Sequence, residues 1–347
     1  LGSNLFHHVR RGEILRSVPR DNEAVNECWL SDRDRYAHQG LYAEDRATVP
    51  LVRDGDGFRE ASWEDALKHA AALLRAQGGD DLGVLVHPAT ANEEGALLAR
   101  LADALGCGHL DHRIGQLDLS DGAAAEAFPL PLAEIEQADA IVLVGTHLRH
   151  EVPLLHQRVR KAAKRGARVH VVNPVDFDLT FAPASRRIVP PSQLAAALGE
   201  VALGEAAHAV VIVGALAENG PHAAAIRRAA AAFAAATNAK LCRIPQGANA
   251  LGLTRQGVLP AGLDAQAMLR QPRKAYLLYG IEPGLDFADA AAAHRALGGA
   301  RVLAFSHYAC ASTRAVAEVI LPIAALPELD ATLTNLEGRT QAASAAG

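Results

Sequence analysis

Short, uninterrupted runs of Val, Ile and Leu alternate along most of this chain with segments of helical periodicity, and this alternation restricts the fold more than any other feature. Such runs are typical of strands buried on both faces, which occur in parallel sheets covered by helices. Strands are predicted at residues 82–87, 140–145, 168–172, 209–213, 275–279 and 301–305. Helices are predicted at residues 62–74, 93–105, 153–165, 222–236 and 288–297. The pattern predicts an α/β protein with two Rossmann-like parallel sheets.

The first 60 residues follow a different pattern. They are polar and strongly charged, with short apolar alternations at residues 6–9 and 14–18. We interpret them as a small β-rich module with long loops. The pattern changes at Ser62, where Ser62 and Asp65 nearly match a capping box and predict the start of a helix.

Charge and hydropathy exclude several functional classes. The 347 residues include 34 basic and 39 acidic side chains, with a net charge of −5. A mildly acidic chain with few aromatic residues lacks the basic surface and stacking platforms of a nucleic-acid binder. No apolar run approaches the ~18–20 residues of a membrane span. The chain opens without a secretory signal or an initiator Met, so we expect a fragment of a longer protein.

The four cysteines stand at positions 28, 107, 242 and 310, and no pair forms C-x-x-C. This spacing excludes zinc ribbons and thioredoxin-like motifs. It favours four buried free thiols in a reducing compartment over any disulfide.

Two loops are candidates for binding a ligand. Residues 106–111 are glycine-rich but follow a helix, so they lack the strand–loop–helix geometry of a dinucleotide site. Val144-Gly145-Thr146 is a better candidate, because it ends an apolar strand, where open α/β sheets bind ligands. Most such strand ends are ordinary turns, and this alternative stays open.

The densest group of possible metal ligands is His147, His150, Glu151 and His156. Pro153 disfavours helix at the preceding residue, so a loop is predicted here, with histidines that are solvated or structurally hydrogen-bonded. No G-x-S-x-G elbow is present and no residue stands out as a nucleophile.

Several segments, taken in order, resemble molybdopterin oxidoreductases over essentially the whole chain. Residues 317–322 read AEVILP and residues 332–341 read TLTNLEGRTQ, with Ala331 where the family usually has Gly. The other matching positions are residues 40–46, 50–53, 63–67, 92–94, 110–113 and 138–145, with Glu151, Pro153, Arg158 and Glu328.

Residues 25–36 are similar to a segment of the large iron–sulfur subunit (the G subunit in bacteria) of respiratory NADH:quinone oxidoreductase, complex I. Many members of that family have a C-x2-C-x3-C-x27-C motif here that binds a [4Fe–4S] cluster. Its last two cysteines would fall on Ser3 and Ser31, which are both Ser. A hydroxyl is a poor ligand for cluster iron, which thiolates hold, and Cys28 could not replace both. We therefore expect this cluster to be missing.

The resemblance implies that the chain is a segment of the electron-transfer subunit of complex I. It further implies that the segment is a non-catalytic structural scaffold of the peripheral arm, on the cytoplasmic side of the bacterial inner membrane. Its expected partners are the other subunits of that arm, without nucleic acid and without a direct membrane span. We expect no catalytic, cofactor-binding or metal residue and no cofactor in this chain, with [2Fe–2S] and [4Fe–4S] clusters upstream in the full-length subunit.

By analogy with the family, we expect three pieces. These are residues 1–60 as a degenerate [4Fe–4S]-type module, 61–113 plus 273–347 as a first α/β lobe, and 114–272 as a second. The alternative function is an active molybdopterin-dependent oxidoreductase, which would need a Cys or Ser ligand in a glycine-rich pterin environment. Cys107, Cys242 and Cys310 lack that setting. An unrelated nucleotide-binding module would leave the ordered resemblances unexplained.

Overall fold

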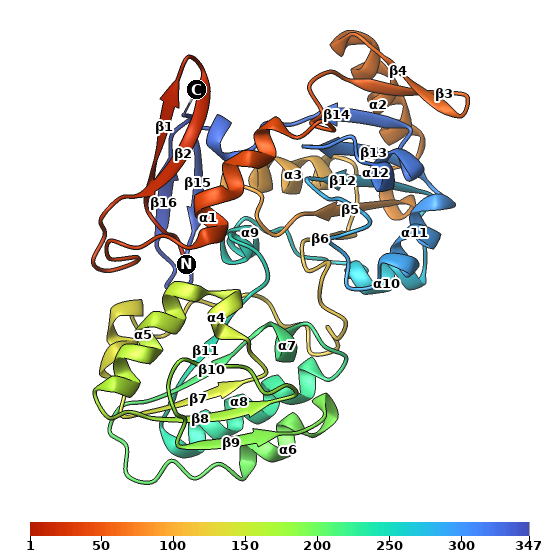
Figure 1. Ribbon diagram of the computed structural model, residues 1–347. Helices are drawn as coiled ribbons and strands as arrows, with labels where there is room; N and C mark the ends of the chain where they lie inside the picture. The colour runs from red at the N-terminus through yellow and green to blue at the C-terminus, as the bar shows by residue number, and fades with distance from the viewer. Residues whose placement is uncertain (347) are drawn as a thin grey trace.

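The computed structural model describes residues 1–346. It contains two separate, mainly parallel sheets, each covered by helices on both faces (Figure 1). A smaller region of antiparallel hairpins lies beside them. This arrangement confirms the predicted α/β class with a small β-rich region.

The seven-stranded sheet has the order β4-β3-β14-β13-β12-β5-β6. Its strands are β3 (Leu51–Asp54), β4 (Gly57–Glu60), β5 (Leu82–Val86), β6 (Leu110–Asp111), β12 (Ala275–Tyr279), β13 (Arg301–Ser306) and β14 (Val319–Pro322). The pairs from β14 to β6 are parallel, whereas β3 pairs antiparallel with β14 and with β4. The sheet thus combines strands from two distant stretches of the chain.

Helices cover both faces of this sheet because its strands are apolar on both sides. Leu82 and Val84 face the helices α2 (Trp63–Ala76), α3 (Asn92–Ala104) and α9 (Ala250–Arg255). Leu85, on the opposite side of β5, packs with α10 (Ala265–Arg270), α11 (Ala290–Gly298) and α12 (Ala311–Val316). The predicted start of α2 is confirmed, since the Ser62 hydroxyl accepts a hydrogen bond from the Asp65 N–H at 3.2 Å.

The five-stranded sheet is parallel throughout, in the order β11-β10-β7-β8-β9. Its strands are β7 (Ala140–Val144), β8 (Arg168–Asn173), β9 (Ser185–Ile188), β10 (Ala209–Val213) and β11 (Lys240–Arg243). All five lie in the chain between β6 and β12 of the other sheet.

The helices of this unit also form two layers. The first layer contains the 3-10 helix η3 (Leu132–Gln137), α4 (Leu148–Glu151) and α5 (Pro153–Lys164), which pack with Ile141 and Leu143 of β7. The second layer contains α6 (Leu194–Gly199), α7 (Ala215–Glu218) and α8 (Ala223–Thr237), which pack with Val142 and Val144. Alternate residues of β7 therefore face opposite layers, as expected for a strand buried on both sides.

The two ends of the chain form the smaller region. The N-terminal part contains β1 (Leu5–Arg10), β2 (Glu13–Pro19), α1 (Asp32–Tyr36) and the 3-10 helix η1 (Ala37–Tyr42). The C-terminal strands β15 (Ala331–Thr334) and β16 (Thr340–Ala343) form a second antiparallel hairpin, drawn beside the first in Figure 1. The Gln341 amide of β16 donates to the Gly2 carbonyl at 3.0 Å, which ties the two ends together. Short 3-10 turns complete the chain at η2 (Gly79–Asp81), η4 (Pro191–Gln193) and η5 (Leu326–Glu328).

Two details differ from the sequence-based expectations. Strands β3 and β4 lie within residues 1–60 but belong to the seven-stranded sheet, because Val52 and Leu51 pair with β14. Their separation from β14 in sequence conceals this pairing. The four cysteines are free as expected, but Cys28 is exposed and only Cys107 and Cys242 are buried.

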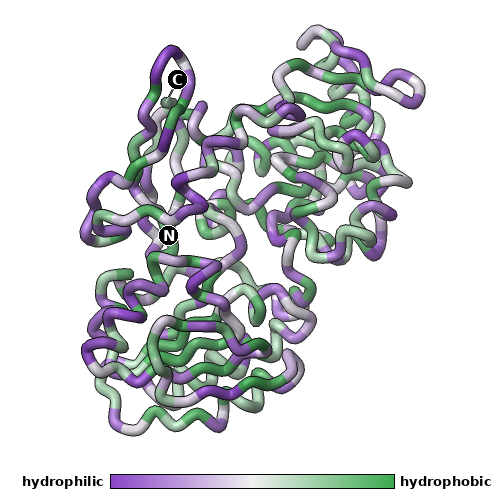
Figure 2. Tube along the Cα trace, viewed as in Figure 1, coloured by the Kyte–Doolittle hydropathy of each residue, from purple (hydrophilic) through white to green (hydrophobic). Residues whose placement is uncertain are grey.

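Hydropathy along the chain follows the two sheets, with the strands of both cores hydrophobic and the loops around them mostly hydrophilic (Figure 2). None of the helices in residues 1–346 is long and apolar enough to cross a bilayer.

Candidate functional site

The strand end Val144-Gly145-Thr146 lies at the switch point of the five-stranded sheet. The chain leaves β7 toward β8 on one side and later returns to place β10 on the other, so ligands of open sheets would bind between the ends of β7 and β10. Gly145 has φ +53°, and a Cβ built on it would lie 2.6 Å from the Ala217 Cβ. The loop is therefore packed directly against α7.

A side chain of the protein occupies this switch point. The Glu151 carboxylate accepts hydrogen bonds from the His147 N–H at 2.7 Å and from the Ala215 N–H at 2.9 Å. These donors follow β7 and β10, where an open sheet offers backbone N–H groups to an anionic ligand. The Glu151 side chain thus already bonds the backbone N–H groups that a bound anion would need.

The histidines near Glu151 do not converge on a common centre. The His147 ring stacks on Phe177 at 4.1 Å between centroids, whereas the His156 Nε2 is 3.2 Å from the Thr180 hydroxyl. No group of three or more His, Cys, Asp and Glu residues in the described part of the chain is arranged to hold a metal ion. The predicted loop is wrong in detail, because residues 148–151 form the single helical turn α4. Pro153 begins α5 at its first position, where no N–H is required.

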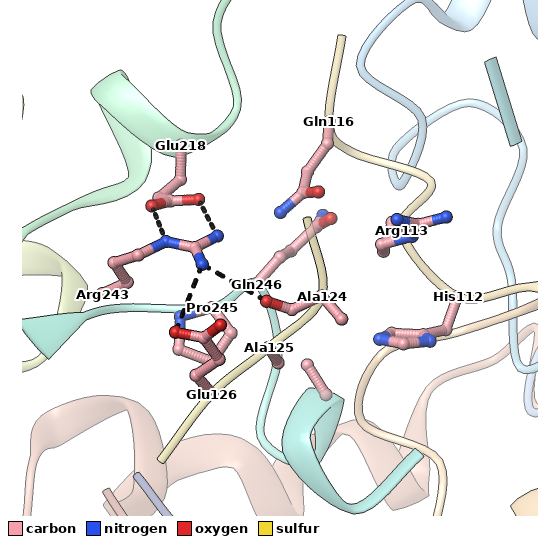
Figure 3. Close-up of a pocket in the computed structure, with 11 residues that line it drawn as sticks. His112, Arg113, Gln116, Ala124, Ala125, Glu126, Glu218, Arg243, Pro245 and Gln246 are labelled. Carbon is pink, nitrogen blue, oxygen red and sulfur yellow. Dashed lines mark hydrogen bonds and ion pairs between the residues drawn. The ribbon is translucent and has the colours of Figure 1, made fainter. Parts of the chain in front are cut away.

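A small cleft, partly open to solvent, lies between the two sheet-containing units (Figure 3). Its positive charges are neutralised by the protein. Arg243 donates to both carboxylate oxygens of Glu218, at 2.8 and 3.1 Å, and Arg113 donates to both of Asp111, at 2.8 and 3.0 Å. Arginines paired in this bidentate way are not free to bind a diphosphate.

His112 lines the same cleft and is fully buried. Its Nδ1 is 2.7 Å from the Val258 carbonyl, and its Nε2 has no protein partner. Burial lowers the pKa of His112, so the ring is neutral near neutral pH. Sequence reasoning missed this cleft, because its walls come from residues more than a hundred positions apart in the chain.

The carboxyl end of the seven-stranded sheet is lined by acidic groups. The His87 Nε2 lies 3.7 Å from the Asp286 carboxylate, and the Glu282 N–H donates to the same carboxylate at 2.7 Å. Burial and the Asp286 charge together raise the pKa of Glu282. Two neighbouring carboxylates make this edge unfavourable for an anionic ligand.

Ser3 and Ser31 lie in segments joined by Asn26, whose buried amide accepts from the Asn4 N–H at 2.9 Å and donates to the Trp29 carbonyl at 3.1 Å. Ser31 is the N-cap of α1: its hydroxyl accepts from the Asp34 N–H at 3.2 Å and donates to the Asp34 carboxylate at 2.8 Å. The Ser31 hydroxyl therefore has a structural role, which is to cap the N-terminus of α1.

The N-terminal segment is anchored to the five-stranded unit by one buried arginine. Arg158 of α5 is 3% exposed, and it donates to the Glu136 carboxylate at 2.8 Å and to the Val25 carbonyl at 3.1 Å. Lys161, one turn later, donates to Glu27 at 2.6 Å. This contact fixes residues 23–27 on the surface of α5.

Two protein-family models match most of the chain. Residues 46–347 match the molybdopterin oxidoreductase family, and residues 1–39 match the NDSU1/NuoG-like 4Fe-4S domain of NADH-ubiquinone oxidoreductase. The chain belongs to the molybdopterin oxidoreductase family, as its two covered sheets and ordered motifs indicate.

Its relatives define the branch of that family. The chain is 30% identical to the mitochondrial 78 kDa subunit of NADH-ubiquinone oxidoreductase from Candida albicans, covering 100% of this chain and 48% of that protein. It is 29% identical to the G subunit of NADH-quinone oxidoreductase from Mycobacterium bovis, covering 95% of this chain and 47% of that protein. The chain is thus homologous to these large subunits of the enzyme, and it spans about half of their length.

Solved structures show the same fold at low sequence identity. Acetylene hydratase from Pelobacter acetylenicus superposes with a TM-score of 0.73 and 13% identity, covering 99% of this chain and 64% of that one. A chain of the formyltransferase/hydrolase complex from Methylorubrum extorquens superposes with a TM-score of 0.56 and 18% identity, covering 85% of this chain and 92% of that one.

The family raises the question of whether the residues present fit a pterin-bound molybdenum or a [4Fe–4S] cluster. The cleft arginines are paired with carboxylates, Glu151 fills the switch point, and acidic groups line the edge of the other sheet. At Ser3 and Ser31, where the resemblance places two cluster cysteines, the donors are hydroxyls, and the Ser31 hydroxyl caps a helix. These donor sets do not match the chemistry of either group.

Proposed function

We propose that this chain is a structural segment of the electron-transfer subunit of NADH:quinone oxidoreductase, and that it acts there as a non-catalytic scaffold. In this proposal it has no catalytic, cofactor-binding or metal residue. It assembles with other subunits of the peripheral arm on the cytoplasmic side of the inner membrane. Electron transfer belongs to clusters elsewhere in the full-length subunit.

The observation that supports the scaffold role best is the position of Glu151. A sheet that binds a ligand at its switch point leaves backbone donors free there, whereas here Glu151 bonds the N–H groups of His147 and Ala215. The hydroxyl donors at Ser3 and Ser31 support the same conclusion for the cluster position.

The proposal includes a domain organisation in which one lobe interrupts the other. The first lobe comprises residues 61–113 and 273–347, and the second comprises residues 114–272. The strand orders of the two sheets support this division, with β3 and β4 added to the first lobe. An interrupted lobe holds both ends of its insertion in place, which suits a rigid support.

Metal analysis of the purified chain tests the cofactor part of the proposal. We expect neither iron nor molybdenum above trace amounts by ICP-MS, and no visible absorption band. Molybdenum near one atom per chain would identify an active molybdopterin enzyme and refute the scaffold role. A Cys28→Ser variant is the matched control, because iron held only by the exposed Cys28 thiol would disappear in it. Cluster iron that persists in this variant would contradict the proposal.

Co-purification tests the assembly. A tagged full-length subunit, extracted from membranes in mild detergent, should retain NADH dehydrogenase activity and other subunits of the complex. If it is recovered alone, the assignment to this complex is wrong, whatever the metal content.

A further inference from the structure

The β1–β2 hairpin has one anchored face and one free face. On the anchored face, Ser17 is buried, its hydroxyl lies 3.0 Å from the His7 Nδ1, and the Ile14 N–H donates to the Tyr42 hydroxyl at 2.6 Å. On the other face, Phe6 is 51% exposed. Leu15, which has no partner in β1 where the register shifts, is 57% exposed. The hairpin is therefore held by η1 and presents apolar side chains outward.

The free face is strongly basic. Residues 5–20 contain four arginines and one glutamate, in a chain whose net charge is −5. All four arginines, which are Arg10, Arg11, Arg16 and Arg20, are exposed. Their side-chain contacts in the described part of the chain are with neutral groups: Arg16 donates to the His8 Nδ1 at 3.0 Å, and Arg20 lies over the Phe6 ring at 5.3 Å. These positive charges are thus not neutralised within the fold.

The edges of the hairpin are also free. It forms a sheet of two strands, and no third strand pairs with it within residues 1–346. An unpaired edge can accept a strand from another polypeptide. In Figure 1 the tip of this hairpin points away from the five-stranded sheet.

We propose that the outward face of the β1–β2 hairpin is a docking surface for a protein partner that presents an acidic extended segment with apolar side chains. Charge complementarity selects the acidic partner, and Phe6 and Leu15 supply the apolar contact. A protein is favoured over a lipid or nucleic-acid surface because the face combines Arg and Phe without Lys, which is the composition of protein interfaces. This inference stands independently of the proposed function.

Binding of a defined probe tests the proposal. The probe is a fluorescent peptide of alternating Glu and Val, titrated into the purified chain and followed by anisotropy. We expect saturable binding that weakens with added salt. The double variant R10E/R16E should weaken this binding by at least about tenfold through like-charge repulsion. The control R228E/R295E places the same charge change on exposed arginines of α8 and α11 and should leave binding unchanged.

Three results would overturn the proposal. One is an equal affinity of R10E/R16E and the parent chain for the Glu–Val peptide. Another is equally tight binding of a Lys–Val peptide. The third is preferential binding of a DNA duplex or of phosphatidylserine vesicles that R10E/R16E abolishes, which would assign the face to nucleic acid or lipid. A photo-crosslinker at position 15 should label the Glu–Val peptide, and one at the exposed Leu285 should not. Thermal unfolding of each variant confirms that the hairpin substitutions leave the fold intact.

Discussion

The Glu151 carboxylate accepts a hydrogen bond from the Ala215 N–H at 2.9 Å, and this contact joins the ends of β7 and β10 at the switch point of the five-stranded sheet. The second carboxylate oxygen accepts from the His147 N–H at 2.7 Å. One side chain thus joins the segments that follow β7 and β10, at the place where open α/β sheets bind ligands.

Replacing Glu151 should destabilise the protein in proportion to the acceptors lost. Glu151→Ala removes both acceptors, so we expect a loss of about 1–3 kcal/mol in the free energy of unfolding, measured in urea. Glu151→Gln keeps one acceptor oxygen and should lose less. The control is Glu64→Ala, which removes an exposed ion pair with Lys68 and should cost less than about 0.5 kcal/mol. Equal effects of Glu151→Ala and Glu64→Ala would refute the structural role of Glu151.

Gly145 should not tolerate a side chain. A Cβ there would lie 2.6 Å from the Ala217 Cβ, in addition to the strain of φ +53°. Gly122 has a similar φ of +67° with nothing within 4 Å of a built Cβ, so Gly122→Ala measures the backbone strain alone. We expect Gly145→Ala to cost about 1–3 kcal/mol more than Gly122→Ala. Equal costs would show that α7 moves aside without penalty.

Arg158 should be needed to hold the N-terminal segment. Arg158→Met removes the hydrogen bonds to the buried Glu136 carboxylate and to the Val25 carbonyl. We therefore expect the free energy of unfolding to fall by about 3–5 kcal/mol. Hydrogen exchange should increase at residues 22–31 before it increases in β7. Arg149→Met removes an exposed pair with Asp178 and is the matched control, with little expected effect. Unchanged protection of residues 22–31 in Arg158→Met would contradict the anchoring role.

Stability should decrease as the pH falls below about 6.5. Burial lowers the pKa of His156 to about 4, and burial with the nearby Arg46 guanidinium lowers the pKa of His307 to about 4. Between the unfolded value near 6.5 and this folded value, the unfolded chain binds protons that the folded chain does not. Each histidine therefore contributes up to about 3 kcal/mol to the free energy of unfolding above about pH 6.5. This contribution is lost as the pH falls toward about 4.

Urea unfolding between about pH 7.5 and 5 measures this dependence. His156→Asn should flatten the loss, because it removes one of the groups that protonate only on unfolding. His222→Asn, at an exposed position, should leave the slope unchanged. If the free energy of unfolding depends on pH in the same way in His156→Asn as in the parent chain, His156 does not contribute to the pH dependence.

The sequence alone determined the class of the fold, because a strand buried on both faces must be apolar at every position. The predicted strands at 140–145 and 275–279 correspond to β7 and β12, and the Ser62 cap also follows from local chemistry. The ordered family motifs and the serines at positions 3 and 31 can likewise be read directly from the sequence. These features depend on side chains close together in the chain.

The tertiary structure decided what fills each potential site. Glu151 meets the Ala215 N–H across 64 residues, and Arg243 meets Glu218 across 25, so no local pattern shows that these groups satisfy each other. The pairing of β3 with β14 is a similar long-range choice. A sequence shows which groups can donate or accept, but only folding determines which partner each group finds, because burial penalises every polar group left without one.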